Sequence, residues 1–183
     1  LNAGADVVVH SLHKSSVGLS QTAVLWSQGN RIDPITLKRS IGCLQTSSPN
    51  ALLLASCESA LKEFTTLLGR RKFLLRIEQA KQLALDLKKK GVPLLDNQDP
   101  LRLILHTGLY GITGLEADSW FVPNGLVAEL PEPGCLTFCL GFAPHKGVAK
   151  LIEKKWNELL LSFKDKTQGP LRPFNSPPIP LVS

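Results

Sequence analysis

The chain has 183 residues, of which 43% are hydrophobic and 20% are charged, a composition typical of soluble globular proteins. This length allows one domain or two small ones, each able to bury a core. The net charge of +6 raises the question of nucleic acid, but no binding motif accompanies the lysines at 88–90 and 154–155. No apolar run reaches membrane-spanning length and we recognise no secretory signal, so we expect a cytoplasmic protein that binds neither nucleic acid nor membrane.

The start of the chain predicts a buried strand followed by a polar cluster. The valines at 7–9 predict a short strand buried on both faces, as in the centre of a parallel α/β sheet. Ser11, His13 and Lys14 follow it, where ligands bind in such sheets, and burial there would favour a neutral, nucleophilic lysine amine. Ser11 and a protonated His13 can hydrogen-bond a phosphate. On spacing alone, a solvated lysine without a catalytic role remains the alternative.

Residues 19–90 predict one further strand followed by helices. We expect a strand at 19–26, a short helix or loop at 32–41, a helix at 49–68 and another at 73–90. Ser48 is a favoured N-cap, Pro49 suits the first helical position, and Gly69 suits the residue after the last turn. The helix at 73–90 ends in three lysines and could join two domains.

The second half predicts a small α/β layer. We expect strands at 101–106, 127–130 and 136–142, helices at 115–122 and 148–163, and a glycine turn at 108–114. The glycine spacing fits neither a dinucleotide fingerprint nor a P-loop, so we interpret the turn as structural. His106 and His145 are also expected to be structural. The prolines after Lys166 predict an extended connector and not a packed element.

The four cysteines lack metal-binding or disulfide spacing. They are Cys43, Cys57, Cys135 and Cys139. Cys135 and Cys139 are about 13 Å apart on one predicted strand, too far for a disulfide or a shared metal. We therefore expect reduced, buried cysteines and no metal site.

Three segments resemble the ornithine/lysine/arginine decarboxylases, which are fold-type I pyridoxal-phosphate enzymes. Residues 11–26 contain Ser-Leu-His-Lys, a short turn and a Gln-containing strand, similar to the family's cofactor-lysine segment. Residues 44–56 resemble its Thr-Ser-Pro block before a long helix. Residues 111–131, from Gly-Ile-Thr-Gly to Glu-Leu-Pro, resemble the start of its smaller domain. The resemblance covers most of residues 3–163, in the same order.

This resemblance implies an α/β fold in several parts. Residues 1–70 would be the C-terminal portion of a fold-type I large domain with a mostly parallel sheet. Residues 71–91 would be a connecting helix, 92–165 a small α/β domain, and 166–183 a proline-rich tail.

The resemblance also implies a cofactor and a reaction. Lys14 would be the catalytic lysine that binds pyridoxal 5'-phosphate covalently, with Ser11 and His13 at its phosphate. Thr46 and Ser47 match a block that reaches the phosphate of a neighbouring subunit, which implies a homodimer or larger assembly with shared active sites. The reaction would be decarboxylation of arginine, lysine or ornithine to the amine, as in polyamine biosynthesis, and the sequence does not decide among these substrates.

One part of the family pattern is missing. The family's Asp-Glu-Ala-His segment supplies the aspartate at the pyridine nitrogen and the histidine that stacks on the ring, and Asp6, which precedes the strand, is no substitute. The chain has no methionine, so we interpret it as a fragment that lacks the N-terminal part of its parent and is inactive alone. The alternatives are another fold-type I enzyme or a non-catalytic remnant. An aminotransferase would need an arginine such as Arg102 for the substrate carboxylate, and a cysteine desulfurase is also possible.

Overall fold

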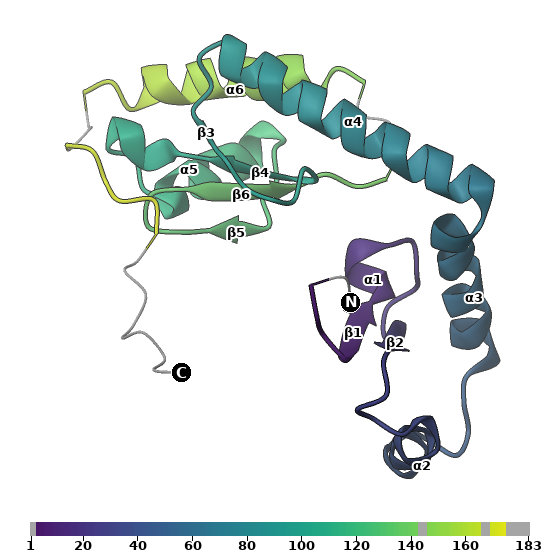
Figure 1. The fold of residues 1–183 in the computed structure, drawn as a ribbon. Helices are drawn as coiled ribbons and strands as arrows, with labels where there is room; N and C mark the ends of the chain where they lie inside the picture. Colours follow the sequence, from purple (N-terminus) through teal and green to yellow (C-terminus); the bar gives the residue numbers. More distant parts are fainter. Residues whose placement is uncertain (1–2, 143–145, 166–168, 175–183) are drawn as a thin grey trace. The chain divides into compact units, whose positions relative to one another are not determined.

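A computed structural model describes residues 3–142, 146–165 and 169–174. The chain divides into two compact units, Leu1–Leu74 and Leu75–Ser183 (Figure 1). The division falls inside helix α4 (Leu67–Lys89). None of the described helices is long and apolar enough to cross a membrane.

The first unit combines a two-stranded sheet with helices. Its elements are β1 (Val7–Ser11), α1 (Leu12–Ser15), β2 (Ala23–Ser27), α2 (Pro34–Leu44), α3 (Ala51–Thr65) and the start of α4. Strands β1 and β2 run antiparallel, with Val7 opposite Ser27 and Ser11 opposite Ala23. Leu12, Ala60 and Thr22 are buried in this unit.

The direction of this strand pair differs from the mostly parallel sheet expected from the sequence. The reason is a tight turn, in which the amide of Thr22 donates to the carbonyl of Leu19 at 3.1 Å and Gln21 has a φ of 74°. This turn sends the chain back alongside β1, so β2 begins at Ala23 and not at residue 19. The expectation of a strand buried on both faces is also wrong here, because Val9 is 69% exposed.

Helix α3 begins two residues later than the sequence predicts. Asn50, not Ser48, is its N-cap, because Asn50 Oδ1 accepts hydrogen bonds from the amides of Leu52 at 2.9 Å and Leu53 at 3.3 Å. The helix ends at Thr65 because Thr66 has an extended backbone, with a ψ of 151°. The expected end at Leu68 is therefore wrong, and α4 already begins at Leu67.

The second unit is a four-stranded antiparallel sheet with helices. Its strands are β3 (Leu94–Leu95), β4 (Arg102–Leu105), β5 (Leu130–Pro131) and β6 (Leu136–Cys139), in the order β3-β4-β6-β5. Its helices are the rest of α4, α5 (Gly114–Phe121), α6 (Val148–Ser162) and the 3-10 turns η1 (Thr107–Tyr110) and η2 (Val122–Asn124). The mixed α/β class is confirmed. Strand β3 was not predicted, because two residues are too few to show an alternating pattern.

Helices and sheet share one hydrophobic core in this unit. Helices α4 and α6 lie on the same side of the sheet (Figure 1). Leu87, Leu105, Phe121 and Trp156 are each at most 1% exposed and belong to this core. The amphipathic pattern predicted for residues 148–163 therefore reports a real buried face.

Residues 169–174 are attached to the second unit by backbone hydrogen bonds, contrary to the expected free connector. The amide of Leu171 donates to the carbonyl of Gly108 at 2.7 Å, and the amide of Gly134 donates to the carbonyl of Pro173 at 3.1 Å. Proline lacks an amide proton but keeps its carbonyl, so a proline-rich segment can still accept backbone hydrogen bonds. Residues 175–183, which hold the last three prolines, lie outside the described residues.

The cysteines are free thiols with different surroundings. Cys135 is fully buried and Cys57 is half-buried, whereas Cys43 and Cys139 are exposed. The expectation of buried cysteines is therefore wrong for Cys43 and Cys139. Cys135 directly precedes β6, so Cys135 and Cys139 do not share one strand as expected.

Candidate functional site

The candidate site is the junction between strand β1 and the single-turn helix α1. Ser11 ends β1 with an extended backbone, φ −73° and ψ 108°, and occupies the N-cap position of α1. Helix α1 then carries His13 and Lys14 on consecutive positions. The local sequence thus places a hydroxyl, an imidazole and a primary amine within one turn of backbone.

The carbonyl oxygen of Thr22 fixes this junction. It accepts hydrogen bonds from the amide of Leu12 at 3.0 Å and from Nδ1 of His13 at 2.9 Å. Because a carbonyl only accepts, Nδ1 carries the proton, and Nε2 is the nitrogen left for a ligand. Thr22 is itself 2% exposed, and its Oγ1 donates to the carbonyl of Leu19 at 2.6 Å. The turn therefore sets the orientation of the His13 ring.

Gly18 allows this turn to close. A Cβ atom at Gly18 would lie 2.3 Å from Thr22 Oγ1 and 2.9 Å from Leu12 Cβ. Sequence reasoning recognised the small-residue turn but missed the role of Thr22. In the sequence, Thr22 is simply the residue after Gln21. Nothing in this pattern indicates that the backbone carbonyl of Thr22 lies beside His13.

Helix α3 contacts the same region. Ser56 Oγ accepts a hydrogen bond from the amide of Leu19 at 2.8 Å. The rings of His10 and Phe64 lie 5.9 Å apart, and Phe64 contacts Phe73 edge-on at 5.7 Å. The strand-to-helix junction is thus held from the turn on one side and from α3 on another.

Lys14 is exposed, and its amine makes no hydrogen bond or ion pair with any residue that the structure describes. The low-dielectric surroundings expected for it are not present in the first unit. As it stands, the junction offers an accessible primary amine beside a histidine of fixed orientation.

Thr46 and Ser47 are not brought to this junction. Both are exposed in the loop that joins α2 to α3, and Thr46 Oγ1 accepts a hydrogen bond from the amide of Ser48 at 3.2 Å. Figure 1 shows this loop well separated from α1 within the first unit. Any joint action of these hydroxyls with Lys14 inside one chain is therefore not supported by their placement.

The glycine turn, which we interpret from the sequence as structural, is closely packed at Gly114. Gly114 lies where a Cβ atom would be 2.2 Å from the carbonyl oxygens of Glu132 and Cys135, so its glycine serves close packing. His106 has a buried Nε2 without a hydrogen-bond partner, and His145 lies outside the described residues. Within the described residues, no group of three His, Cys, Asp or Glu side chains is placed to hold a metal ion.

Comparison with known proteins identifies relatives of this chain. No protein-family model matches the chain. The arginine decarboxylase of Bacillus anthracis is 26% identical over all of this chain, and that of Halalkalibacterium halodurans is 32% identical over 87% of it. This chain is a relative of the ornithine/lysine/arginine decarboxylases. The resemblance seen in the sequence is thereby confirmed. The chain spans 40% and 35% of the length of these two relatives.

Solved structures show the same fold. The constitutive lysine decarboxylase of Escherichia coli matches 86% of this chain with a TM-score of 0.71 at 18% identity. The lysine decarboxylase of Francisella novicida matches 88% of it, also with a TM-score of 0.71, at 17% identity. The chain covers 28% and 29% of these two proteins. These two solved structures thus share the fold of this chain.

Proposed function

We propose that this chain supplies part of a pyridoxal 5'-phosphate-dependent decarboxylase of basic amino acids, with Lys14 as the lysine that holds the cofactor. The observation that carries the proposal is the accessible amine of Lys14 beside the fixed ring of His13, in a relative of arginine decarboxylases. The names of the relatives favour arginine as the substrate, with lysine or ornithine next. The first unit would then be the C-terminal portion of a fold-type I large domain, whose parallel strands lie outside this pair.

The residues of the junction suit both the aldehyde and the phosphate of pyridoxal phosphate. Lys14 offers a primary amine to the aldehyde. His13 donates through Nδ1 to the carbonyl of Thr22, so its Nε2 would be the ring nitrogen that donates to a phosphate oxygen when protonated. Ser11 adds a hydroxyl at the N-cap of α1. The pyridine nitrogen needs an acid, and Asp6 does not suit this role because it precedes β1 and pairs with Arg31 at 3.5 Å.

The chemistry divides between cofactor and chain. When bound, pyridoxal phosphate supplies an electron sink for the electron pair left by departing carbon dioxide. Lys14 would hold the aldehyde end through Nζ, and as a free amine Nζ would hold or transfer a proton. His13 and Ser11 would orient the phosphate.

The wider assembly is part of the same proposal. Thr46 and Ser47 are exposed and lie apart from Lys14, which suits a contact with the cofactor phosphate of a neighbouring subunit in a homodimer or larger oligomer. We place this enzyme in the cytoplasm. We also propose that residues 1–183 alone do not decarboxylate basic amino acids, because Lys14 is open to solvent and Asp6 is engaged elsewhere.

A non-catalytic remnant is the second candidate function, and the exposure of Lys14 favours it. Borohydride reduction in the presence of pyridoxal phosphate separates the two candidates. We expect a pyridoxyl group on Lys14, detected by peptide mass spectrometry, and its loss in Lys14→Ala. Lys38→Ala, which removes an exposed lysine of α2, is the matched control and should keep the label.

Two labelling results would argue against Lys14 as the lysine that holds the cofactor. A label spread evenly over surface lysines, or unchanged in Lys14→Ala, would contradict the assignment of Lys14. Amine production from arginine, lysine and ornithine then tests the substrate class. A rate of about 1 per second or more by residues 1–183 alone would contradict the expected inactivity.

A further inference from the structure

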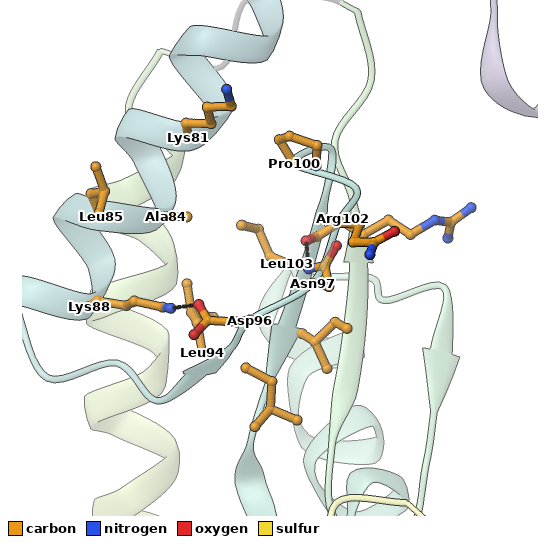
Figure 2. A pocket seen from close by; sticks show the side chains of 13 residues that line it. Lys81, Ala84, Leu85, Lys88, Leu94, Asp96, Asn97, Pro100, Arg102 and Leu103 are labelled. Atoms are coloured by element: carbon orange, nitrogen blue, oxygen red, sulfur yellow. Dashed lines mark hydrogen bonds and ion pairs between the residues drawn. The ribbon is translucent and has the colours of Figure 1, made fainter. Parts of the chain in front are cut away.

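A cavity of about 410 Å³ lies in the second unit between helix α4 and strands β3 and β4 (Figure 2). Its walls include Lys81, Ala84, Leu85 and Lys88 from the helix and Leu94 and Leu103 from the strands. The helix residues recur at intervals of three, four and seven, so they share one face. The volume falls in the range of small-molecule sites. Ala84, Leu85, Leu94 and Leu103 give the cavity apolar walls.

Two lysines mark this cavity, and they differ in their surroundings. Lys88 forms an ion pair with Asp96, which Figure 2 shows as a contact between the helix and the loop after β3. Lys81 lies two helical turns away, about 10 Å along the axis. Its amine has no ion pair or hydrogen bond with the described residues, and Figure 2 shows it at the same end of the cavity as Pro100. Lys81 is therefore the cation available to a ligand.

The remaining charge on the strand side is already engaged. Arg102 Nε pairs with Asp99 at 3.4 Å, and its Nη1 lies 3.1 Å from Cys139 Sγ on the neighbouring strand. Figure 2 shows the Arg102 side chain directed away from α4. The cavity is lined by three cations, of which Lys88 pairs with Asp96 and Arg102 pairs with Asp99 outside the lining. Lys81 is the lining cation that has no ion pair with the described residues.

The loop that forms the rim is preorganised. Asn97 Oδ1 accepts from the amide of Asp99 at 2.7 Å, and Asn97 Nδ2 donates to the carbonyl of Arg102 at 2.9 Å. Asp99 Oδ1 accepts from the amide of Leu101 at 3.0 Å. These bonds fix the loop before any ligand arrives, which lowers the entropic cost of binding.

We propose that this cavity binds a small organic monoacid with an apolar body, whose carboxylate pairs with Lys81 and whose body contacts Ala84, Leu85, Leu94 and Leu103. An apolar interior alone would accept neutral molecules equally. The single unpaired ammonium at one end makes the cavity selective for one negative charge. This site is independent of Lys14 and of the function proposed for it.

Three matched probes test the charge preference: 4-phenylbutyrate, 4-phenylbutanol and 4-phenylbutylamine. Titration of the full chain followed by two-dimensional amide NMR gives both the affinity and the location of binding. We expect 4-phenylbutyrate to shift the amides of residues 81–104, the alcohol to bind at least about fivefold more weakly, and the amine to bind more weakly still.

Two variants and one control make the assignment specific. Lys81→Ala should weaken 4-phenylbutyrate about fivefold and bring it to the level of the alcohol. Ala84→Phe should fill the cavity and abolish the shifts. Lys89→Ala removes an exposed lysine of the same helix that does not line the cavity, so binding should be unchanged. Equal affinities for the three probes, no effect of Lys81→Ala, or shifts confined to residues outside 81–104 would each overturn the proposal.

Discussion

Nδ1 of His13 lies 2.9 Å from the carbonyl oxygen of Thr22, nine residues further along the chain. This bond joins the helix that carries Lys14 to the turn that precedes β2. The orientation of the imidazole therefore depends on how closely the turn approaches the helix, and Gly18 sets that approach.

Replacing Gly18 with alanine should loosen this junction. The added Cβ would meet Thr22 Oγ1 at 2.3 Å and Leu12 Cβ at 2.9 Å, so turn and helix must separate. We expect a loss of about 1–3 kcal/mol in local stability, measured by hydrogen exchange of peptides that cover β1 and β2. Gly42→Ala is the control, because nothing lies within 4 Å of its Cβ position in α2, and it should stabilise that helix by about 0.5–1 kcal/mol. Equal exchange in Gly18→Ala and the unaltered chain would contradict this packing.

The cap of helix α3 gives a second test with a built-in control. Asn50→Ala removes the acceptor for the amides of Leu52 and Leu53 and should cost about 1 kcal/mol in the stability of α3. Ser48→Ala should change it by less than about 0.5 kcal/mol, because Ser48 is exposed and outside the helix. Hydrogen exchange of the α3 amides measures both. A larger effect at Ser48 than at Asn50 would restore the cap predicted from the sequence.

Asp33 should make helix α2 sensitive to acid. The hydroxyl of Thr36 and then its amide donate to the Asp33 carboxylate, and these bonds lower the pKa of Asp33 below its ordinary value of 3.8. A lowered folded pKa means that the carboxylate stabilises the folded state fully above pH 3.8, and that this contribution is lost as the pH falls through the folded pKa. An NMR titration should give a midpoint below 3.8.

Two variants separate the cause of this shift. Thr36→Val removes the hydrogen bond from the Thr36 hydroxyl to the Asp33 carboxylate and should move the midpoint up toward 3.8. Ser40→Ala should leave it unchanged, because the Ser40 hydroxyl donates to the carbonyl of Thr36 and does not touch Asp33. An unchanged titration midpoint of Asp33 in Thr36→Val would show that the Thr36 hydroxyl does not lower the pKa of Asp33.

The thiols should differ in reactivity. Burial, followed by the nearby Glu132 charge, raises the pKa of Cys135 to about 11. At pH 8 almost none of Cys135 is thiolate, and the side chain is fully buried. We expect iodoacetamide to modify the exposed Cys43 readily and Cys135 only after urea is added, as read by peptide mass spectrometry. Equal labelling of the two in the folded chain would contradict the buried position of Cys135.

Local sequence patterns predict the elements better than their partners. The apolar repeat at 148–163 marks α6 almost to the residue, and the strands expected at 101–106 and 136–142 contain β4 and β6. These patterns report one face of one element. The direction of β2 depends on the backbone of Gln21, which has a positive φ. A positive φ is uncommon for glutamine, so the sequence does not predict it.

In the candidate site, too, the sequence predicts which residues are neighbours along the chain but not which distant atoms contact them. Ser11, His13 and Lys14 are neighbours in sequence, so a short motif predicts their proximity. The fixed ring of His13 depends on the carbonyl of Thr22, a backbone atom that carries no sequence signature. The cap of α3 was missed for a different reason, because Ser48 and Asn50 are both good N-caps and the choice depends on where the preceding loop ends.

Gly134 should control the attachment of the segment that follows helix α6. A Cβ atom at Gly134 would lie 2.3 Å from the carbonyl oxygen of Arg172, which is backbone and cannot move alone. Gly134→Ala should therefore release residues 171–173, and the hydrogen bonds of this segment to Gly108 and Gly134 should be lost.

The core of the second unit does not depend on this segment, so the release should be local. We expect limited proteolysis with chymotrypsin to cleave after Leu171 faster in Gly134→Ala, while hydrogen exchange in β4 stays the same. Gly169→Ala is the control, because nothing lies within 4 Å of its Cβ position. Cleavage at the same rate in all three chains would mean that the segment is not held at Gly134. Slower exchange at Leu171 in Gly134→Ala would contradict the packing outright, because an added methyl group would then have tightened a contact that has no room for it.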